Sequence, residues 1–153
     1  MPDVFTKAKR SDVMSRIRGR GNKETELALM KLLRRHHITG WRRHQKVFGK
    51  PDFLFRRNRL ALFVDGCFWH RCPRCYRRPK SNRKFWDAKI ARNRERDRQV
   101  THELRRLGWR VIRIWEHALA RRQKFIFDRI QAALQKAPVD WKKYDRPKIV
   151  QKH

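Results

Sequence analysis

An excess of positive charge constrains this chain more than any other feature of its sequence. Lysine and arginine number 43 among 153 residues and aspartate and glutamate only 14, which leaves a formal net charge of +29. Such a chain repels itself unless a polyanion neutralises it. Hydrophobic residues still make up 39% of it, which is too rich for a disordered basic tail. We therefore expect one folded domain with a basic surface, of a size that a single core can fill.

The distribution of the cations indicates which polyanion the chain meets. Lysine and arginine recur in every segment, among them Arg16, Arg18 and Arg20 near the N-terminus. Membrane binding concentrates cations beside an amphipathic anchor, whereas contact with a phosphate backbone spreads them over a face. This pattern favours nucleic acid over a membrane, with solvated surface charge as the alternative. Because no apolar run reaches the ~18 residues of a membrane span and no signal-peptide pattern is present, we expect a soluble intracellular protein.

The hydrophobic pattern predicts a mixed α/β order without internal repeats. Helices are expected over 22–36, 82–107 and 119–136, where apolar residues recur at helical spacing between capping and terminating residues. The β-rich runs 52–55 and 60–64 predict a hairpin, and the run 109–115 a buried strand. Residues 65–82 predict an irregular loop. The chain therefore divides into a basic segment over 1–20 that lies on the partner, a folded domain over 21–137 and a basic tail over 138–153.

All three cysteines fall in the predicted loop. Cys67, Cys72 and Cys75 form C-x4-C-x2-C, and this spacing lets one loop wrap a tetrahedral metal ion with three thiolates. The fourth ligand is either His70, inside the cluster, or His117, just after the strand 109–115. The mixed nitrogen and sulfur set favours zinc over an iron–sulfur cluster. The alternative is three free thiols packed as small apolar residues.

Carboxylates occupy positions where apolar residues are expected. Asp52 follows Pro51 at a strand start and Asp65 closes the next strand, so the hairpin brings two acids together, as in sites that hold Mg²⁺ against a phosphate. Glu26 and Asp97 interrupt the inward stripes of two predicted helices. A carboxylate there is costly unless it is paired or binds a cation. A salt bridge to one of the many cations is the alternative for these two.

Two large aromatics lie in the polar loop beside a histidine. Phe68 and Trp69 have no periodicity that would place them in a core, and Trp86 follows at the start of the next helix. Such side chains can wedge between base pairs and unstack them. Packing against the cysteine loop is the alternative. His70 remains open as a zinc ligand, a solvent-exposed ring or a general base.

Several blocks of the sequence closely resemble the very-short-patch-repair mismatch endonucleases of bacteria. They are D-G-C-F-W-H at 65–70, K-F-W at 84–86, N-R-E-R-D-R at 93–98, G-W-R-V at 108–111 and I-W-E-H-A-L at 114–119. The resemblance runs from about Lys9 to Arg121. It implies a restriction-endonuclease-like α/β fold of the PD-(D/E)XK type, with a central mixed sheet flanked by helices and a zinc-pinned loop. It also implies an enzyme that nicks double-stranded DNA 5′ of the thymine in a T:G mismatch, the lesion left when 5-methylcytosine deaminates.

The resemblance further implies roles for individual residues. Asp52 matches the essential Mg²⁺ ligand and His70 the general base, while Glu26 and Asp97 match acidic residues that support the site. The wedge that intercalates beside the mismatch is matched by Phe68, Trp69 and Trp86, and the ligands of a structural zinc by Cys67, Cys72, Cys75 and His117.

The chain departs from the resembled family at the end of the third predicted strand. The best-known members carry Thr-His where this chain has Val64-Asp65. We expect the Val64 carbonyl to remain a Mg²⁺ ligand and Asp65 to bind the metal directly or through water. The implied partners are mismatched DNA and mismatch-repair proteins, met by a monomer in the bacterial cytoplasm at the nucleoid. Two alternatives stay open: a nuclease of the same fold with another DNA target, as in restriction or phage defence, and a non-cleaving zinc-stabilised nucleic-acid-binding protein.

Overall fold

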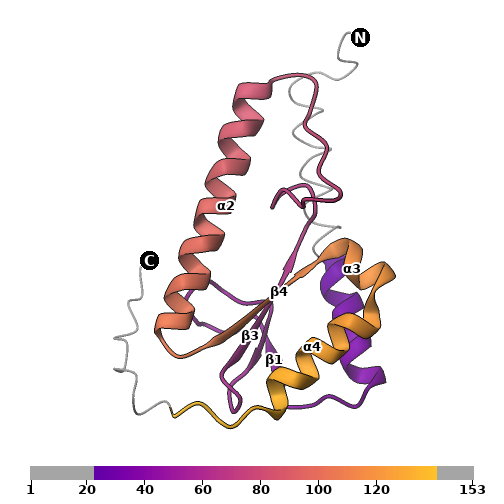
Figure 1. Ribbon diagram of the computed structural model, residues 1–153, viewed down its shortest axis with the longest axis vertical. Coiled ribbons are helices and arrows are strands. Elements are labelled where there is room, and N and C mark those ends of the chain that lie inside the picture. The colour runs from indigo at the N-terminus through magenta and orange to yellow at the C-terminus, as the bar shows by residue number, and fades with distance from the viewer. Residues whose placement is uncertain (1–22, 141–153) are drawn as a thin grey trace.

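A mixed β-sheet lies between helices in the computed structural model, which describes residues 23–140 (Figure 1). Arg16, Arg18 and Arg20, together with most of the predicted tail, lie outside these residues. The elements in chain order are a helix over residues 23–35, β1 (Trp41–Arg43), β2 (Phe53–Phe55), β3 (Leu60–Asp65), α2 (Arg83–Arg106), β4 (Arg110–Trp115), α3 (Glu116–Arg121) and α4 (Gln123–Gln135).

The sheet has the order β1-β2-β3-β4. Strands β1, β2 and β3 are antiparallel neighbours, and the predicted hairpin is formed by β2 and β3 with Phe53 opposite Leu62. β4 pairs with β3 in parallel, which requires a long crossover, and α2 supplies it. β2 and β3 are buried along their whole length because helices cover both faces of the sheet.

Each face of the sheet packs against its own set of helices. On one face, Leu29 and Leu33 of the helix 23–35 and Ile126 and Ile130 of α4 pack against strand residues such as Leu62. On the other face, α2 contributes Leu104 to a smaller cluster with residues Leu54, Ala61 and Phe63. The alternation of side chains along a strand thus sends neighbouring residues of β3 toward different helices.

Two predicted elements differ from the structure. The helix expected over 119–136 begins earlier and is divided into α3 and α4 at Arg122, whose φ of −133° and ψ of 43° are not helical. The strand expected over 109–115 begins at Arg110 and is only half-buried, because β4 lies at the edge of the sheet. Within residues 23–140, β4 therefore pairs with β3 on one side and has no strand on its other side.

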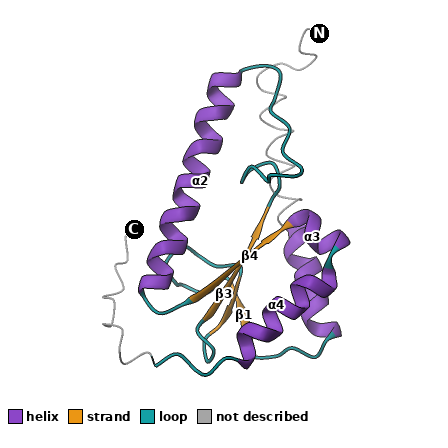
Figure 2. Ribbon diagram, viewed as in Figure 1, coloured by secondary structure: helices purple, strands orange, loops and turns teal. Residues whose placement is uncertain are grey.

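The loop after β3 runs beside the N-terminal half of α2, which extends beyond the sheet (Figure 2). The loop before β2 also lies close to α2: a side chain on Gly49, whose φ is +75°, would come within 2.3 Å of Val100. These close approaches fix both loops against one helix.

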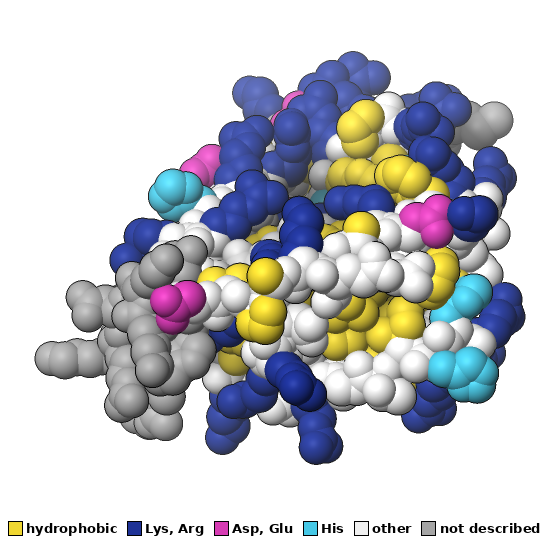
Figure 3. Space-filling view, turned by 60° about the horizontal axis from the view of Figure 1, so that its bottom comes forward, with side chains coloured by type: hydrophobic (Ala, Val, Ile, Leu, Met, Phe, Trp, Pro, Cys, Tyr) yellow, Lys and Arg dark blue, Asp and Glu magenta, His cyan; other side chains and the backbone are white. Residues whose placement is uncertain are grey.

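The surface of the described residues is dominated by basic side chains. Lysine and arginine spread over the face shown in Figure 3, with few acidic side chains between them. No helix within residues 23–140 is both long and apolar enough to cross a bilayer.

Candidate active site and metal centre

Asp52 is fixed at the end of the β2–β3 hairpin. Its backbone N–H donates to the Leu62 carbonyl at 3.0 Å, and its Oδ2 accepts a hydrogen bond from the Val64 N–H at 2.7 Å. Burial raises the pKa of Asp52 from 3.8 to about 7, against the effect of the Val64 hydrogen bond and with a further contribution from the nearby Glu26 carboxylate. The side chain is therefore held in place, but among the described residues no positively charged group lies close enough to offset the cost of burying its negative charge.

Glu26, in the first turn of the helix 23–35, lies against Asp52. Its Oε2 is 2.5 Å from Arg43 Nη2 and 3.3 Å from His44 Nε2, and its carboxylate lies near enough to Asp52 to raise the pKa of that group. Two neighbouring carboxylates repel each other unless a positive charge lies near both of them. A hard cation that takes oxygen ligands can supply that charge. The pair therefore fits a divalent cation such as Mg²⁺, and Glu26 also makes the salt bridge considered as its alternative role.

Asp65, the last residue of β3, belongs to a second group of charges. It is the only charged side chain of residues 23–140 that is buried, with 5% of the residue exposed. Burial raises its pKa, and the nearby His70 and Arg113 oppose that rise. Arg113 Nη1 lies 2.7 Å from Asp65 Oδ1, and Arg113 Nη2 lies 3.3 Å from Asp97 Oδ1. The hairpin thus brings Asp52 and Asp65 to one end of the sheet, but each bonds to different partners.

His70 completes this second group. Its Nδ1 forms a hydrogen bond with Asp97 Oδ2 and lies 3.8 Å from Asp65 Oδ1. Because an ionised carboxylate can only accept, the bond places the proton on Nδ1 and leaves Nε2 as the atom able to take a proton. Asp97, a carboxylate on the inward stripe of α2, therefore orients His70 of the facing loop.

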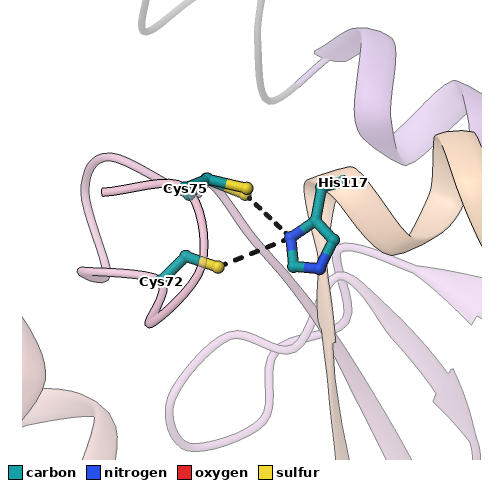
Figure 4. A group of neighbouring side chains, drawn as sticks. Cys72, Cys75 and His117 are labelled. Carbon is teal, nitrogen blue, oxygen red and sulfur yellow. Dashed lines mark hydrogen bonds between the residues drawn. The ribbon is translucent and has the colours of Figure 1, made fainter. Parts of the chain in front are cut away.

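The three cysteines and His117 form a separate cluster at the other side of the loop. Their ligand atoms all lie within 4.8 Å of one another, and the thiols of Cys67 and Cys72 are each 3.4 Å from His117 Nδ1. Figure 4 shows Cys72 and Cys75 pointing toward the His117 ring. A tetrahedral ion with bonds of about 2.0–2.3 Å separates its ligands by roughly 3.5 Å, so this set fits a metal ion. His70, the other histidine considered for this site, lies with Asp97 instead.

The Cys67 thiol needs a positive charge nearby if it is to ionise. Burial raises the pKa of Cys67 to about 12 despite a hydrogen bond with the His117 backbone, so a metal ion beside this sulfur is what would hold it as a thiolate. Glu116 supports the same turn, because its Oε2 accepts a hydrogen bond from the Cys67 N–H at 3.2 Å.

The aromatic residues form one cluster between the loop and α2. The ring centroids of Phe68 are 5.1 Å from Trp69 and 5.4 Å from Trp86, and Phe85 lies 5.1 Å from Trp86. Asn93 of α2 anchors the loop by donating to the Trp69 carbonyl at 3.1 Å. Trp86, which follows the helical spacing of Ile90 and Leu104, is only 7% exposed, whereas Phe85 is 48% exposed. The cluster is thus buried at Trp86 and open at Phe85.

The sequence did not identify Arg43 and Arg113 as residues of the candidate site, where they form ion pairs with its carboxylates. The signal for Arg113 was present, because an arginine in the apolar run of β4 faces the same side as Val111 and hence the acidic position on α2.

Comparison with known proteins identifies the family. The family model described as DNA mismatch endonuclease Vsr matches residues 2–77. A type II nicking enzyme, V.NmeDIP of Neisseria meningitidis serogroup C, is 36% identical over 134 residues, which cover 86% of this chain and 90% of that enzyme. The chain belongs to the Vsr family. It is also 39% identical to the DNA mismatch endonuclease Vsr of Escherichia coli K12, over 81% of this chain and 80% of that one.

The type II nicking enzyme V.NaeI of Lentzea aerocolonigenes is more similar but over a shorter region. It is 52% identical over 68 residues, which are 44% of this chain and 41% of that enzyme. Membership of the Vsr family confirms the restriction-endonuclease-like fold expected from the sequence, with its mixed sheet flanked by helices. Enzymes of the Vsr family are endonucleases, so the family also makes this chain a DNA-cleaving hydrolase.

Proposed function

We propose that this Vsr-family endonuclease nicks one strand of double-stranded DNA 5′ of the thymine in a T:G mismatch arising from deamination of 5-methylcytosine. The observation that carries the proposal is the Asp52–Glu26 carboxyl pair beside the His70–Asp97 pair. One pair suits a cation that contacts a phosphate, and the other suits removal of a proton from water. The relative named DNA mismatch endonuclease Vsr supports a mismatch as the target.

The residues of the first pair would hold Mg²⁺. Asp52 and the Val64 carbonyl are the proposed ligands, with Glu26 close enough to complete or support the set. When bound, Mg²⁺ stabilises the negative charge that develops on the phosphate in the transition state. Arg43 holds Glu26 in position through its ion pair.

His70 is the proposed general base. Asp97 fixes its Nδ1–H, so Nε2 can accept a proton from the attacking water while Asp97 stabilises the imidazolium that forms. Water then attacks the phosphorus, the bond from phosphorus to the leaving oxygen breaks on one strand, and that oxygen takes up a proton from solvent. Phe68, Trp69 and Trp86 are proposed to insert beside the mismatch, where a step that lacks normal pairing costs less to open.

The cysteine cluster is proposed to bind one structural zinc ion through Cys67, Cys72, Cys75 and His117. Three thiolates and one imidazole complete a tetrahedron and leave no open position for chemistry. Elemental analysis of freshly purified protein is expected to find about one zinc per chain. A zinc content near zero would show that the cysteines serve another purpose.

The decisive experiment incubates the protein with Mg²⁺ and matched, T:G and other mismatched duplexes. We expect nicking of the T:G duplex, and a loss of orders of magnitude in Asp52→Ala and in His70→Ala with DNA affinity roughly unchanged, because affinity depends on many phosphate contacts. Asp128→Asn on α4 and His102→Ala on α2, two exposed positions, are the matched controls.

Other outcomes separate the alternatives. Relatives named type II nicking enzymes favour a second candidate, a nuclease with another DNA target, and nicking of matched duplexes at a fixed sequence would support it. Absence of nicking on every duplex would indicate a non-cleaving binding protein.

A further inference from the structure

Arg113 is an unusual residue for its position. It lies in β4 between Ile112 and Ile114, which belong to the core on one face of the sheet. Its own side chain lies on the opposite face, where its guanidinium stacks 4.4 Å above the Phe63 ring and is 23% exposed. Phe63 is the residue directly beside it in the parallel β3–β4 pairing. An arginine in this environment loses much of its hydration and needs strong partners.

All three nitrogens of the Arg113 guanidinium have such partners. Nη1 contacts Asp65 Oδ1 at 2.7 Å, Nη2 contacts Asp97 Oδ1 at 3.3 Å and Nε donates to Thr101 Oγ1 at 3.0 Å. The planar fork thereby connects the end of β3 with the middle of α2. It lies between two carboxylates that would otherwise repel each other.

A pair of carboxylates such as Asp65 and Asp97 is suited to hold a metal ion, and nucleases with two-metal sites hold each ion in this way. Here a fixed guanidinium supplies that charge. We propose that Arg113 replaces a second metal ion: it neutralises Asp65, positions Asp97 and through it His70, and confines divalent-cation binding to Asp52 and Glu26. This inference depends on the proposed function, because it assigns Arg113 to the same reaction.

The proposal changes the expectation for Asp65. The sequence suggested a direct or water-mediated Mg²⁺ ligand, but the carboxylate is committed to Arg113 and 7% of its side chain is exposed. Asp65 would then act as the fixed counter-charge of Arg113. Arg113 itself is a positioning residue, because it touches neither Asp52 nor the Nε2 of His70 through any contact of the described residues.

The test uses the full-length protein and Mn²⁺ as the probe, with calorimetry as a readout independent of nicking. Wild-type protein should bind one Mn²⁺ that Asp52→Asn removes, and Asp65→Asn should leave that affinity within about twofold, since Asp65 is no ligand in this account. Arg113→Met keeps the aliphatic stem but removes the charge, so a second Mn²⁺ should bind between Asp65 and Asp97. The double variant Asp65→Asn/Arg113→Met should lose that second ion again.

Single-turnover nicking provides the second readout. Arg113→Met should lower the rate by about 10²-fold, the size of a general-base contribution, with an unchanged half-saturating DNA concentration. High Mg²⁺ should restore part of the rate in this variant. Arg113→Lys keeps the positive charge but lacks the planar guanidinium that bonds to both carboxylates. Its nicking rate should therefore lie between those of Arg113→Met and wild type. Arg110→Met is the matched control, because Arg110 lies on the same strand but donates to the carbonyls of Ala133 and Ala137.

Three results would overturn the proposal. One is loss of Mn²⁺ binding in Asp65→Asn, which would make Asp65 a ligand. Another is wild-type nicking with one bound ion in Arg113→Met. The third is an Arg113→Lys variant that folds, as judged by thermal unfolding, yet nicks no faster than Arg113→Met. Failure of the proposed function is distinguishable, because it would appear as wild-type protein that does not nick T:G duplexes, whatever the Mn²⁺ stoichiometry of the variants.

Discussion

A single carboxyl group illustrates the conflict between stability and chemistry at this site. Asp52 is positioned by the Val64 N–H, but burial raises its pKa from 3.8 to about 7. Below pH 3.8 the group is protonated in both the folded and the unfolded chain and costs nothing. Between pH 3.8 and about 7 it ionises in the unfolded chain first, so stability falls as the pH rises. Above about pH 7 the full penalty is present.

Replacing Asp52 by asparagine should therefore stabilise the protein in a pH-dependent way. Asparagine can still accept from the Val64 N–H, and its amide can donate to Glu26, but it carries no charge. Without added Mg²⁺, Asp52→Asn should raise the melting temperature at pH 8 and have little effect at pH 4. Asp128→Asn, an exposed change on α4, should have little effect at either pH. An equal gain at pH 4 and pH 8 would mean that ionisation of Asp52 is not the cause.

The site residues that the sequence can identify are those marked by local spacing. The spacing C-x4-C-x2-C marks three candidate metal ligands on one loop, and a carboxylate on an inward helical stripe marks Asp97. The ion-pair partner of Asp65 could not be found in this way. Arg113 comes from β4, 48 residues further along the chain, and only the β3–β4 register brings it near Asp65. A short-range pattern carries no information on such a contact.

At the scale of elements, β2, β3 and β4 were predictable from the sequence, whereas β1 and one helix break were not. β2 and β3 are short apolar runs separated by a turn at Arg56–Arg59, where Arg59 has a φ of 52°. The division of α3 from α4 at Arg122 has no such signal, because arginine is an ordinary helix residue. The break follows from tertiary packing: α3 must keep His117 at the cysteines while α4 turns to cover the sheet with Ile126.

The aromatic cluster of the loop and α2 allows a test of lesion recognition. Trp69 is partly exposed in the loop, whereas Trp86 is 7% exposed beneath it. Trp69→Ala should therefore weaken binding to T:G DNA by about 1–3 kcal/mol, as for base–aromatic stacking, with matched DNA binding and the melting temperature nearly unchanged. Trp86→Ala should lower the melting temperature as well, because it removes buried packing.

A matched control for this prediction comes from α4. Phe125 of α4 is 45% exposed and stacks with Arg122 at 4.4 Å, far in sequence from the loop. Phe125→Ala should leave T:G discrimination intact. If Trp69→Ala weakened binding to matched and T:G duplexes by the same factor, the aromatics would be general contacts and the wedge would not exist.

At the scale of the whole molecule, the surface cations should set the overall affinity for DNA, and the aromatic cluster should set the preference for a mismatch. Fourteen carboxylates cannot partner 43 lysines and arginines, so most of the cations are available to phosphates. Several of the carboxylates are further committed to the candidate active site, among them Glu26, Asp65 and Asp97. The basic side chains spread over the surface in Figure 3 contact a backbone that is the same in matched and mismatched DNA.

The affinities for matched and T:G duplexes should therefore fall with salt in parallel. A protein that makes 6–10 phosphate contacts loses roughly 10³–10⁵ in affinity between 50 and 200 mM salt, through release of counterions. Stacking at the mismatch releases none, so the ratio of the two affinities should stay constant over this range. Fluorescence anisotropy with the Asp52→Asn protein and labelled duplexes measures both curves without cleavage, and Trp69→Ala in the same background should shift the T:G curve without changing its slope. A ratio that shrinks steadily with salt would instead show that the cations themselves read the lesion, because only contacts made to the distorted backbone would then distinguish the two duplexes.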